Sequence, residues 1–85
     1  MKVFTHTVKD PEGVHALPAS GFIKLANGFT CSVTAQGNGS SADCKHLFGL
    51  MGLGVKCGQD LTITCDGADE IQAAEALERF LKNNL

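Results

Sequence analysis

The segment GVHALPAS, residues 13–20, places a histidine directly in front of the start of a helix. Pro18 is tolerated only in the first turn of an α-helix, so it sets the helix start near His15 or Ala16. The N-terminus of a helix presents N–H groups without intrahelical partners and the positive end of the helix dipole, and both favour anions. The segment therefore predicts an imidazole beside an anion-binding helix end.

His15 is the candidate catalytic residue of the chain. A neutral imidazole is a good nucleophile toward a phosphoryl group. Once the ring carries phosphate, the backbone N–H groups of Ala16 and Leu17 are expected to bind the phosphate oxygens. The alternative is a histidine that serves only as a turn residue, because a short motif by itself is a hypothesis.

The length and composition describe one globular domain spanning residues 1–85. A chain of this size buries one modest core and no deep cavity, which favours chemistry at a surface residue with a docking partner. The net charge of −2 gives nucleic-acid binding no electrostatic support. No apolar stretch is long enough for membrane insertion and the N-terminus has no signal-peptide pattern, so we expect a cytoplasmic protein.

Outward from the first helix, hydrophobic periodicity predicts four strands and three helices. The expected elements are a strand at 3–8, a helix at 16–27, strands at 29–36 and 41–45, a short helix within 46–54, a strand at 59–65, and a final helix after Asp69. The order βαββαβα predicts an α+β fold, in which a four-stranded antiparallel sheet carries three helices on one face. The other face is expected to be polar, with Thr5, Thr7, Ser32, Thr34, Thr62 and Thr64.

Turn and capping residues set the bounds of these elements. Asn38-Gly39 lies between two alternating segments and predicts a tight β-hairpin. Asp69, with Gln72 three residues later, predicts a capping box at the last helix. The apolar spacing in that helix predicts a buried stripe formed by Ile71, Ala74, Leu77 and Leu81.

The remaining cysteines and histidines carry weaker signals. Cys31 and Cys65 fall on apolar positions of strand-like segments and are interpreted as buried thiols. Cys44 and His46 lack two further ligands at metal-site spacing, so no metal is predicted. His6 shares one side of its strand with apolar residues, which favours a packed, partly buried ring.

The apolar segment 47–53 has two interpretations. Its large side chains are Leu47, Phe48, Leu50, Met51 and Leu53. In the first interpretation all of them belong to the core. In the second, a short helix cannot turn every side chain inward, so two or three are exposed and form a docking surface for another protein.

The chain resembles, over essentially its full length, the HPr family of histidine-containing phosphocarrier proteins of the bacterial sugar phosphotransferase system. The matching positions are Gly13-Val14-His15-Ala16-x-Pro18-Ala19, Asn38-Gly39, Lys45, Gly49-Leu50-Met51-x-Leu53-Gly54, Gly58 and Asp66-Gly67-Ala68-Asp69-Glu70. The resemblance implies an open-faced β-sandwich. It also implies that His15 accepts a phosphoryl group from enzyme I and passes it to sugar-specific IIA components.

The same resemblance implies a docking surface beside His15. The expected partner-binding residues are Ser20, Lys24, Leu47, Phe48 and Met51. We expect a monomeric phosphocarrier without a cofactor, phosphorylated on histidine rather than acting as a turnover enzyme.

Two positions depart from the family pattern. Leu17 stands where the family has an arginine, whose guanidinium would bind and orient phosphate through several donors. His46 stands where Gram-positive members have a regulatory serine, so that regulation is not carried over to this chain. The departures keep a second interpretation open: an HPr-fold regulatory or interaction module with weak or no transport phosphotransfer.

Overall fold

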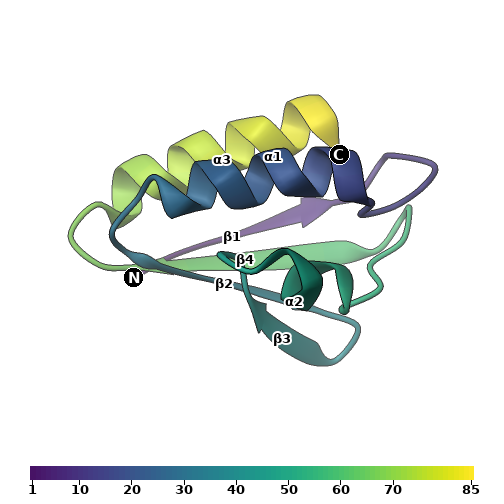
Figure 1. Cartoon of the computed structure of the whole chain (residues 1–85), viewed down its shortest axis with the longest axis horizontal. Helices are drawn as coiled ribbons and strands as arrows, with labels where there is room; N and C mark the ends of the chain where they lie inside the picture. The colour runs from purple at the N-terminus through teal and green to yellow at the C-terminus, as the bar shows by residue number, and fades with distance from the viewer.

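A computed structural model describes all residues, 1–85, and contains the predicted elements in the predicted order (Figure 1). Their bounds are β1 Lys2–Thr7, α1 Ala16–Asn27, β2 Ser32–Gly37, β3 Ser40–Asp43, α2 Leu47–Met51, β4 Asp60–Asp66 and α3 Glu70–Asn84. The predicted bounds of α1 are confirmed without change. Those of β1, β3 and β4 differ by one or two residues at each end, the usual uncertainty of strand ends.

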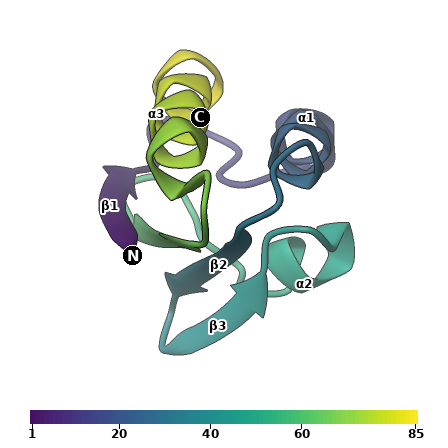
Figure 2. The same ribbon diagram turned by 90° about the vertical axis from the view of Figure 1, so that its left-hand side faces the viewer.

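The strands form one antiparallel sheet in the order β1-β4-β2-β3. Ile63 of the central strand β4 lies opposite Phe4 of β1 on one side and Ala35 of β2 on the other. α1 and α3 lie side by side across one face of the sheet, and α2 lies next to α1 on the side of β2 and β3 (Figures 1 and 2). The predicted α+β fold is confirmed.

A single core lies between the sheet and the helix layer. Val33, Leu61 and Ile63 point inward from the strands and are at most 1 % exposed. Phe22 of α1 and Leu77 of α3 belong to the same buried cluster. Burying one large apolar side chain contributes about 1.5–3 kcal/mol, so this shared cluster holds the two layers together.

The opposite face of the sheet is polar, as predicted. The hydroxyl oxygens of Thr5 and Thr62 lie 3.1 Å apart on neighbouring strands, and Thr7 Oγ1 donates to Asp60 Oδ1 at 2.6 Å. Because no helix covers this face, the cross-strand pairs satisfy polar groups at the surface (Figure 2).

The β2–β3 hairpin turns at Asn38 and Gly39, as predicted. Both residues have positive φ angles, 52° and 78°, which a type I′ hairpin turn requires. The Asn38 amide also donates to the carbonyls of Leu53 and Gly54 at 2.8 and 2.9 Å. These bonds tie the hairpin to the segment after α2, a link that the sequence pattern does not predict.

The predicted capping box at α3 is wrong. Asp69 is the N-cap residue, but its side chain caps no N–H group of α3. Its carboxylate instead accepts hydrogen bonds from the N–H groups of Thr30 and Cys31 at 2.8 and 2.9 Å. The predicted strand 29–36 is too long for the same reason: these N–H groups are bound to a carboxylate rather than to a neighbouring strand, so β2 begins at Ser32.

The predicted buried stripe of α3 is wrong at its first residue. Ala74, Leu77 and Leu81 are buried, but Ile71 is 55 % exposed. The buried face is centred on Ala73, Leu77 and Leu81, which are spaced four residues apart. This spacing places Ile71 at the solvent edge of the stripe.

Asp69→Asn is expected to remove an acid-dependent contribution to stability. The hydrogen bond from the Thr30 N–H, together with those from Cys31, lowers the pKa of Asp69 from 3.8 to about 2. Because the folded-state pKa is depressed, the stabilisation is present above the unfolded value and is lost as the pH falls from about 4 toward 2. Thermal unfolding between pH 7 and 2 measures this loss, with Asp66→Asn as a control of equal charge change.

We expect the variant to be less stable than the wild type at neutral pH and to lose less of its melting temperature on acidification. Parallel melting-temperature curves for the two proteins would contradict this role of Asp69.

Candidate functional site

The candidate site lies where the β1–α1 loop, residues 8–15, meets the first turn of α1 (Figure 1). His15 is the N-cap residue, with an extended backbone (φ −124°, ψ 170°), and its carbonyl accepts the Ala19 N–H at 3.0 Å. The predicted position of His15 at the helix start is confirmed. Helix geometry leaves the N–H groups of Ala16 and Leu17 without intrahelical acceptors, so this end of α1 retains free donors.

Backbone hydrogen bonds fasten the loop to two other parts of the chain. The N–H groups of Lys9 and Asp10 both donate to the Leu85 carbonyl oxygen, at 2.6 and 3.1 Å. The Val14 N–H donates to the Val55 carbonyl at 3.0 Å. Three segments far apart in sequence therefore meet at one end of the molecule and hold the loop that carries His15.

Gly13 is the point of closest approach in this loop. Its φ of +71° lies in the left-handed region that L side chains rarely adopt. A Cβ at this position would lie 2.7 Å from the Val55 carbonyl oxygen and 2.9 Å from Lys56 Cα. Glycine is required here both for the turn and for the packing of the loop against the 55–56 segment.

Two carboxylates face one nitrogen of the His15 ring. Nε2 lies 3.1 Å from Asp10 Oδ2 and 3.5 Å from Glu12 Oε2. The other oxygen of Asp10, Oδ1, accepts the Glu12 N–H at 2.9 Å. This backbone bond, and then the bond to His15, lower the pKa of Asp10 below its usual 3.8. No side chain of the protein is hydrogen-bonded to the second ring nitrogen, Nδ1.

No role was assigned to Asp10 or Glu12 from the sequence, so this arrangement was missed there. Their ligand atoms and a ring nitrogen of His15 all lie within 4.8 Å of one another. The hydrogen bonds within the group account for this closeness, and exposed acidic groups often gather without a metal, so we assign no ion to it. The only sequence signal is the spacing of two acidic residues five and three positions before the histidine.

Comparison with known proteins agrees with this geometry. A family model described as the PTS HPr component phosphorylation site matches residues 2–83. A phosphocarrier protein HPr from Lysinibacillus sphaericus is 40% identical over 81 residues, which are 95% of this chain and 92% of that protein. The chain belongs to the HPr family of phosphocarrier proteins of the phosphotransferase system.

Solved structures of HPr proteins have the same fold. The histidine-containing phosphocarrier protein of a Mycoplasma matches with a TM-score of 0.93 and 30% identity, over 96% of this chain and 93% of that one. Crh, the catabolite repression HPr of Bacillus subtilis, matches with a TM-score of 0.70 and 31% identity, over 99% of this chain and 100% of that one. The fold is therefore shared by a histidine-containing phosphocarrier protein and by Crh, whose name refers to catabolite repression.

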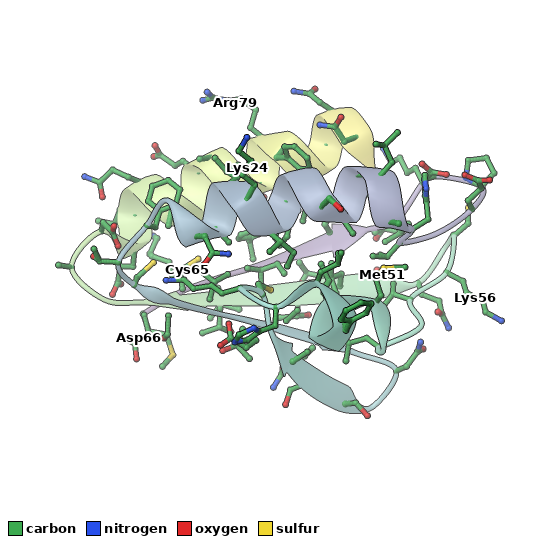
Figure 3. All side chains as sticks on the ribbon, in the orientation of Figure 1. Lys24, Met51, Lys56, Cys65, Asp66 and Arg79 are labelled. Carbon is green, nitrogen blue, oxygen red and sulfur yellow. The ribbon has the colours of Figure 1, made fainter.

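In this HPr-family chain, the apolar segment around α2 divides between core and surface. Leu50 and Leu53 are buried, whereas Phe48 is 87 % exposed. Leu47 and Met51 are partly buried against the core, and Met51 lies on the side of α2 next to α1 (Figure 3). The interpretation that all five side chains belong to the core is therefore wrong. Of the two or three exposed residues that the other interpretation expects, only Phe48 is largely exposed, and its docking role stays a prediction.

The exposed face of α1 continues beside α2. Leu17 is 83 % exposed. Ser20 and Lys24 are also exposed and follow Leu17 by three and seven residues, which places all three on one face of the helix. Lys24 extends outward from α1 in Figure 3. In the sequence, Leu17 was considered for its backbone N–H and as the replacement of an arginine, but its side chain is also an exposed apolar group on the surface next to His15.

The thiols singled out in the sequence belong to the core of the HPr fold. Cys31 and Cys65 are buried, as predicted. Burial raises the pKa of Cys31 to about 11 and that of Cys44 to about 12, so these thiols stay protonated and unreactive at neutral pH. Cys44 is fully buried whereas the His46 side chain is 77 % exposed, so the two do not form a common site.

The side chains of His6 and Lys45 have structural roles. His6 is only 7 % exposed, which confirms the predicted packing role. Lys45 donates from Nζ to the Phe29 carbonyl at 2.8 Å, so its ammonium is bound to the chain at a place away from His15. No helix combines the length and the apolar character needed to cross a membrane.

Gly13→Ala is expected to destabilise the fold by about 1–3 kcal/mol, because the left-handed angle is strained for alanine and the methyl group collides with the backbone. Gly39→Ala is the matched control, since that residue also has a positive φ but no atom lies within 4 Å of its Cβ position. Chemical denaturation of both variants measures the difference. Equal destabilisation of the two proteins would show that the contact with Val55 and Lys56 adds nothing.

Proposed function

We propose that this protein is a phosphoryl carrier of the phosphoenolpyruvate-dependent sugar phosphotransferase system. In this role His15 accepts a phosphoryl group from enzyme I in the cytoplasm and passes it to IIA components. The observation that carries the proposal is the His15 ring, which stands partly exposed at the start of α1 with Nε2 held by Asp10 and Nδ1 unengaged.

The contacts of the ring support Nδ1 as the nucleophilic atom. A carboxylate can only accept a hydrogen bond, so Asp10 favours the tautomer with the proton on Nε2 and the lone pair on Nδ1. In the proposed reaction Nδ1 attacks the phosphorus of a phosphohistidine donor. The P–Nδ1 bond forms as the donor's P–N bond breaks, and the bonding electron pair returns to the donor ring. The free N–H groups of Ala16 and Leu17 accommodate the charged oxygens at the helix end.

The surface around His15 supports docking of a partner. The exposed apolar side chains of Leu17 and Phe48 lie on the neighbouring helices α1 and α2. Exposed apolar side chains that lie together on one surface are typical of a protein-binding site. We propose that enzyme I and IIA components pack on this surface, with contributions from Ser20, Lys24, Leu47 and Met51.

A second candidate is a regulatory or interaction module with weak transport phosphotransfer. Leu17 favours it, because leucine offers no donor to a phosphoryl group at a position where an arginine is expected. The match to Crh, a catabolite repression HPr, is consistent with this candidate. It predicts partner binding without efficient phosphorylation of His15.

Incubation with phosphoenolpyruvate and enzyme I is expected to add one acid-labile phosphoryl group to the wild type and none to His15→Ala. Intact-protein mass spectrometry before and after acid treatment measures the modification, and His46→Ala is the matched control because its imidazole is exposed but has no role in the proposal. An unmodified wild type after prolonged incubation would reject the carrier function and favour the second candidate.

Leu17→Arg is expected to raise the rate of phosphorylation about tenfold, because a charge-assisted hydrogen bond to the transferring group is worth about 1.5–3 kcal/mol. Leu17→Lys supplies the same charge without the planar fork of donors. Its phosphorylation rate is expected to lie between those of the wild type and Leu17→Arg. Rapid-quench measurement of phosphohistidine formation gives the rates. Unchanged rates in both variants would show that the missing guanidinium does not limit transfer.

A further inference from the structure

We infer that Asp10 and Glu12 keep a proton on His15 Nε2 throughout the carrier cycle and so make the phosphoryl group on Nδ1 easy to pass on. The inference rests on the proposed carrier function and adds a role for two residues that the HPr resemblance does not assign. In this role both are positioning residues, since they face the side of the ring away from the reacting atom.

Asp10 is suited to this role because its carboxylate is fixed in place. Its main chain is bound at both polar groups, with the N–H donating to Leu85 and the carbonyl accepting the Gly13 N–H at 2.8 Å. Its Oδ1 accepts the Glu12 N–H, which leaves Oδ2 directed at His15 Nε2 at 3.1 Å. The side chain is only 22 % exposed, so water screens this contact less than it screens a fully exposed pair.

Glu12 adds a second negative charge at the same nitrogen. Its Oε2 lies 3.5 Å from Nε2, and its side chain is 74 % exposed. Because the Glu12 side chain is mostly exposed, water screens its charge and its contribution is smaller than that of Asp10. Together the two carboxylates offer hydrogen-bond acceptors at Nε2 and none at Nδ1.

No lysine or arginine side chain forms a hydrogen bond or ion pair with the His15 ring. The other ionisable residues near the loop are Lys9 on the loop itself and Lys56 and Cys57 on the facing segment, and none of them is bonded to the His15 ring. On α1 the residue at the expected arginine position is Leu17, and α2 contributes no charged side chain. Asp10 and Glu12 are therefore the charged side chains in direct contact with this imidazole.

A proton that stays on Nε2 makes the phosphoryl group on Nδ1 easier to transfer. The ring receives the phosphoryl group on Nδ1 while the Nε2 proton stays in place, which produces a phosphoimidazolium beside two carboxylates. On release, the P–Nδ1 bond breaks toward the acceptor, its electron pair returns to Nδ1, and a neutral imidazole with Nε2–H remains. A protonated ring is the better leaving group, so retaining the proton lowers the barrier to transfer. Release needs no separate general acid.

The first test examines the unphosphorylated protein. Long-range proton–nitrogen NMR of the His15 ring at pH 9, with a metal chelator present, reports which nitrogen carries the proton. We expect Nε2–H in the wild type, with faster exchange of this proton with water in Asp10→Ala. A wild type with the proton mainly on Nδ1, or unchanged exchange in the variant, would overturn the role of Asp10.

The second test examines the phosphoprotein. After phosphorylation by enzyme I and removal of that enzyme, phosphorus NMR measures the hydrolysis rate from pH 5 to 10 for the wild type, Asp10→Asn, Glu12→Gln and the double variant. An opposite charge within hydrogen-bond range shifts a protonation midpoint by about one unit or more. We therefore expect the double variant to have its hydrolysis midpoint about one unit lower and to hydrolyse about tenfold more slowly at pH values well above the wild-type midpoint.

Glu75→Gln, an exposed residue of α3, is the matched control and is expected to follow the wild-type profile. Thermal unfolding identifies any variant whose fold has changed. Coinciding pH profiles of the wild type and the double variant would overturn the inference. A wild type that enzyme I cannot phosphorylate would instead reject the proposed function and the transfer step, while the tautomer measurement still decides whether Asp10 orients the ring.

Discussion

The attachment of the β1–α1 loop to the rest of the chain is the constraint on which the functional end of the molecule depends. Val8 and Val14 of the loop pack in or against the core, and the rest of the loop is positioned by backbone hydrogen bonds to Val55 and Leu85 and by the close contact at Gly13. These bonds place Asp10 and His15 on one rigid turn. Because the partners are backbone groups, the hydrogen bonds themselves do not depend on which side chains stand at positions 55 and 85, whereas a side chain at Gly13 would collide with the 55–56 backbone.

The electrostatics of the site differ from those expected of an anion-binding helix end alone. The free N–H groups at the start of α1 favour a phosphoryl group, whereas two carboxylates on the loop face the opposite nitrogen of the imidazole. The N–H groups act on the phosphoryl group bound at Nδ1, and the carboxylates act on Nε2, so each effect has its own site on the ring. The helix end receives the charged oxygens, and the carboxylates determine where the ring proton lies.

Much of the fold could be predicted because its signals are local. Pro18 set the start of α1, Asn38-Gly39 set the hairpin, and alternation along the strands separated the core face from the threonine face. The errors arose where a side chain bonds a distant backbone. Asp69 is of a residue type that is favoured at helix N-caps. Its carboxylate nevertheless binds two N–H groups of the segment before β2, which lie 38 and 39 positions away in the sequence. Local propensity holds no information about such a partner.

The sequence by itself determined the element order, the polar outer face and the histidine at the start of α1, because each follows from periodicity or from the conformational limits of proline and glycine. Only the tertiary structure decided that Phe48 is exposed while Leu50 is buried, and that Asp10 and Glu12 meet one nitrogen of His15. Both outcomes depend on how packed layers and a constrained loop orient side chains in space, and residue order alone does not specify those orientations.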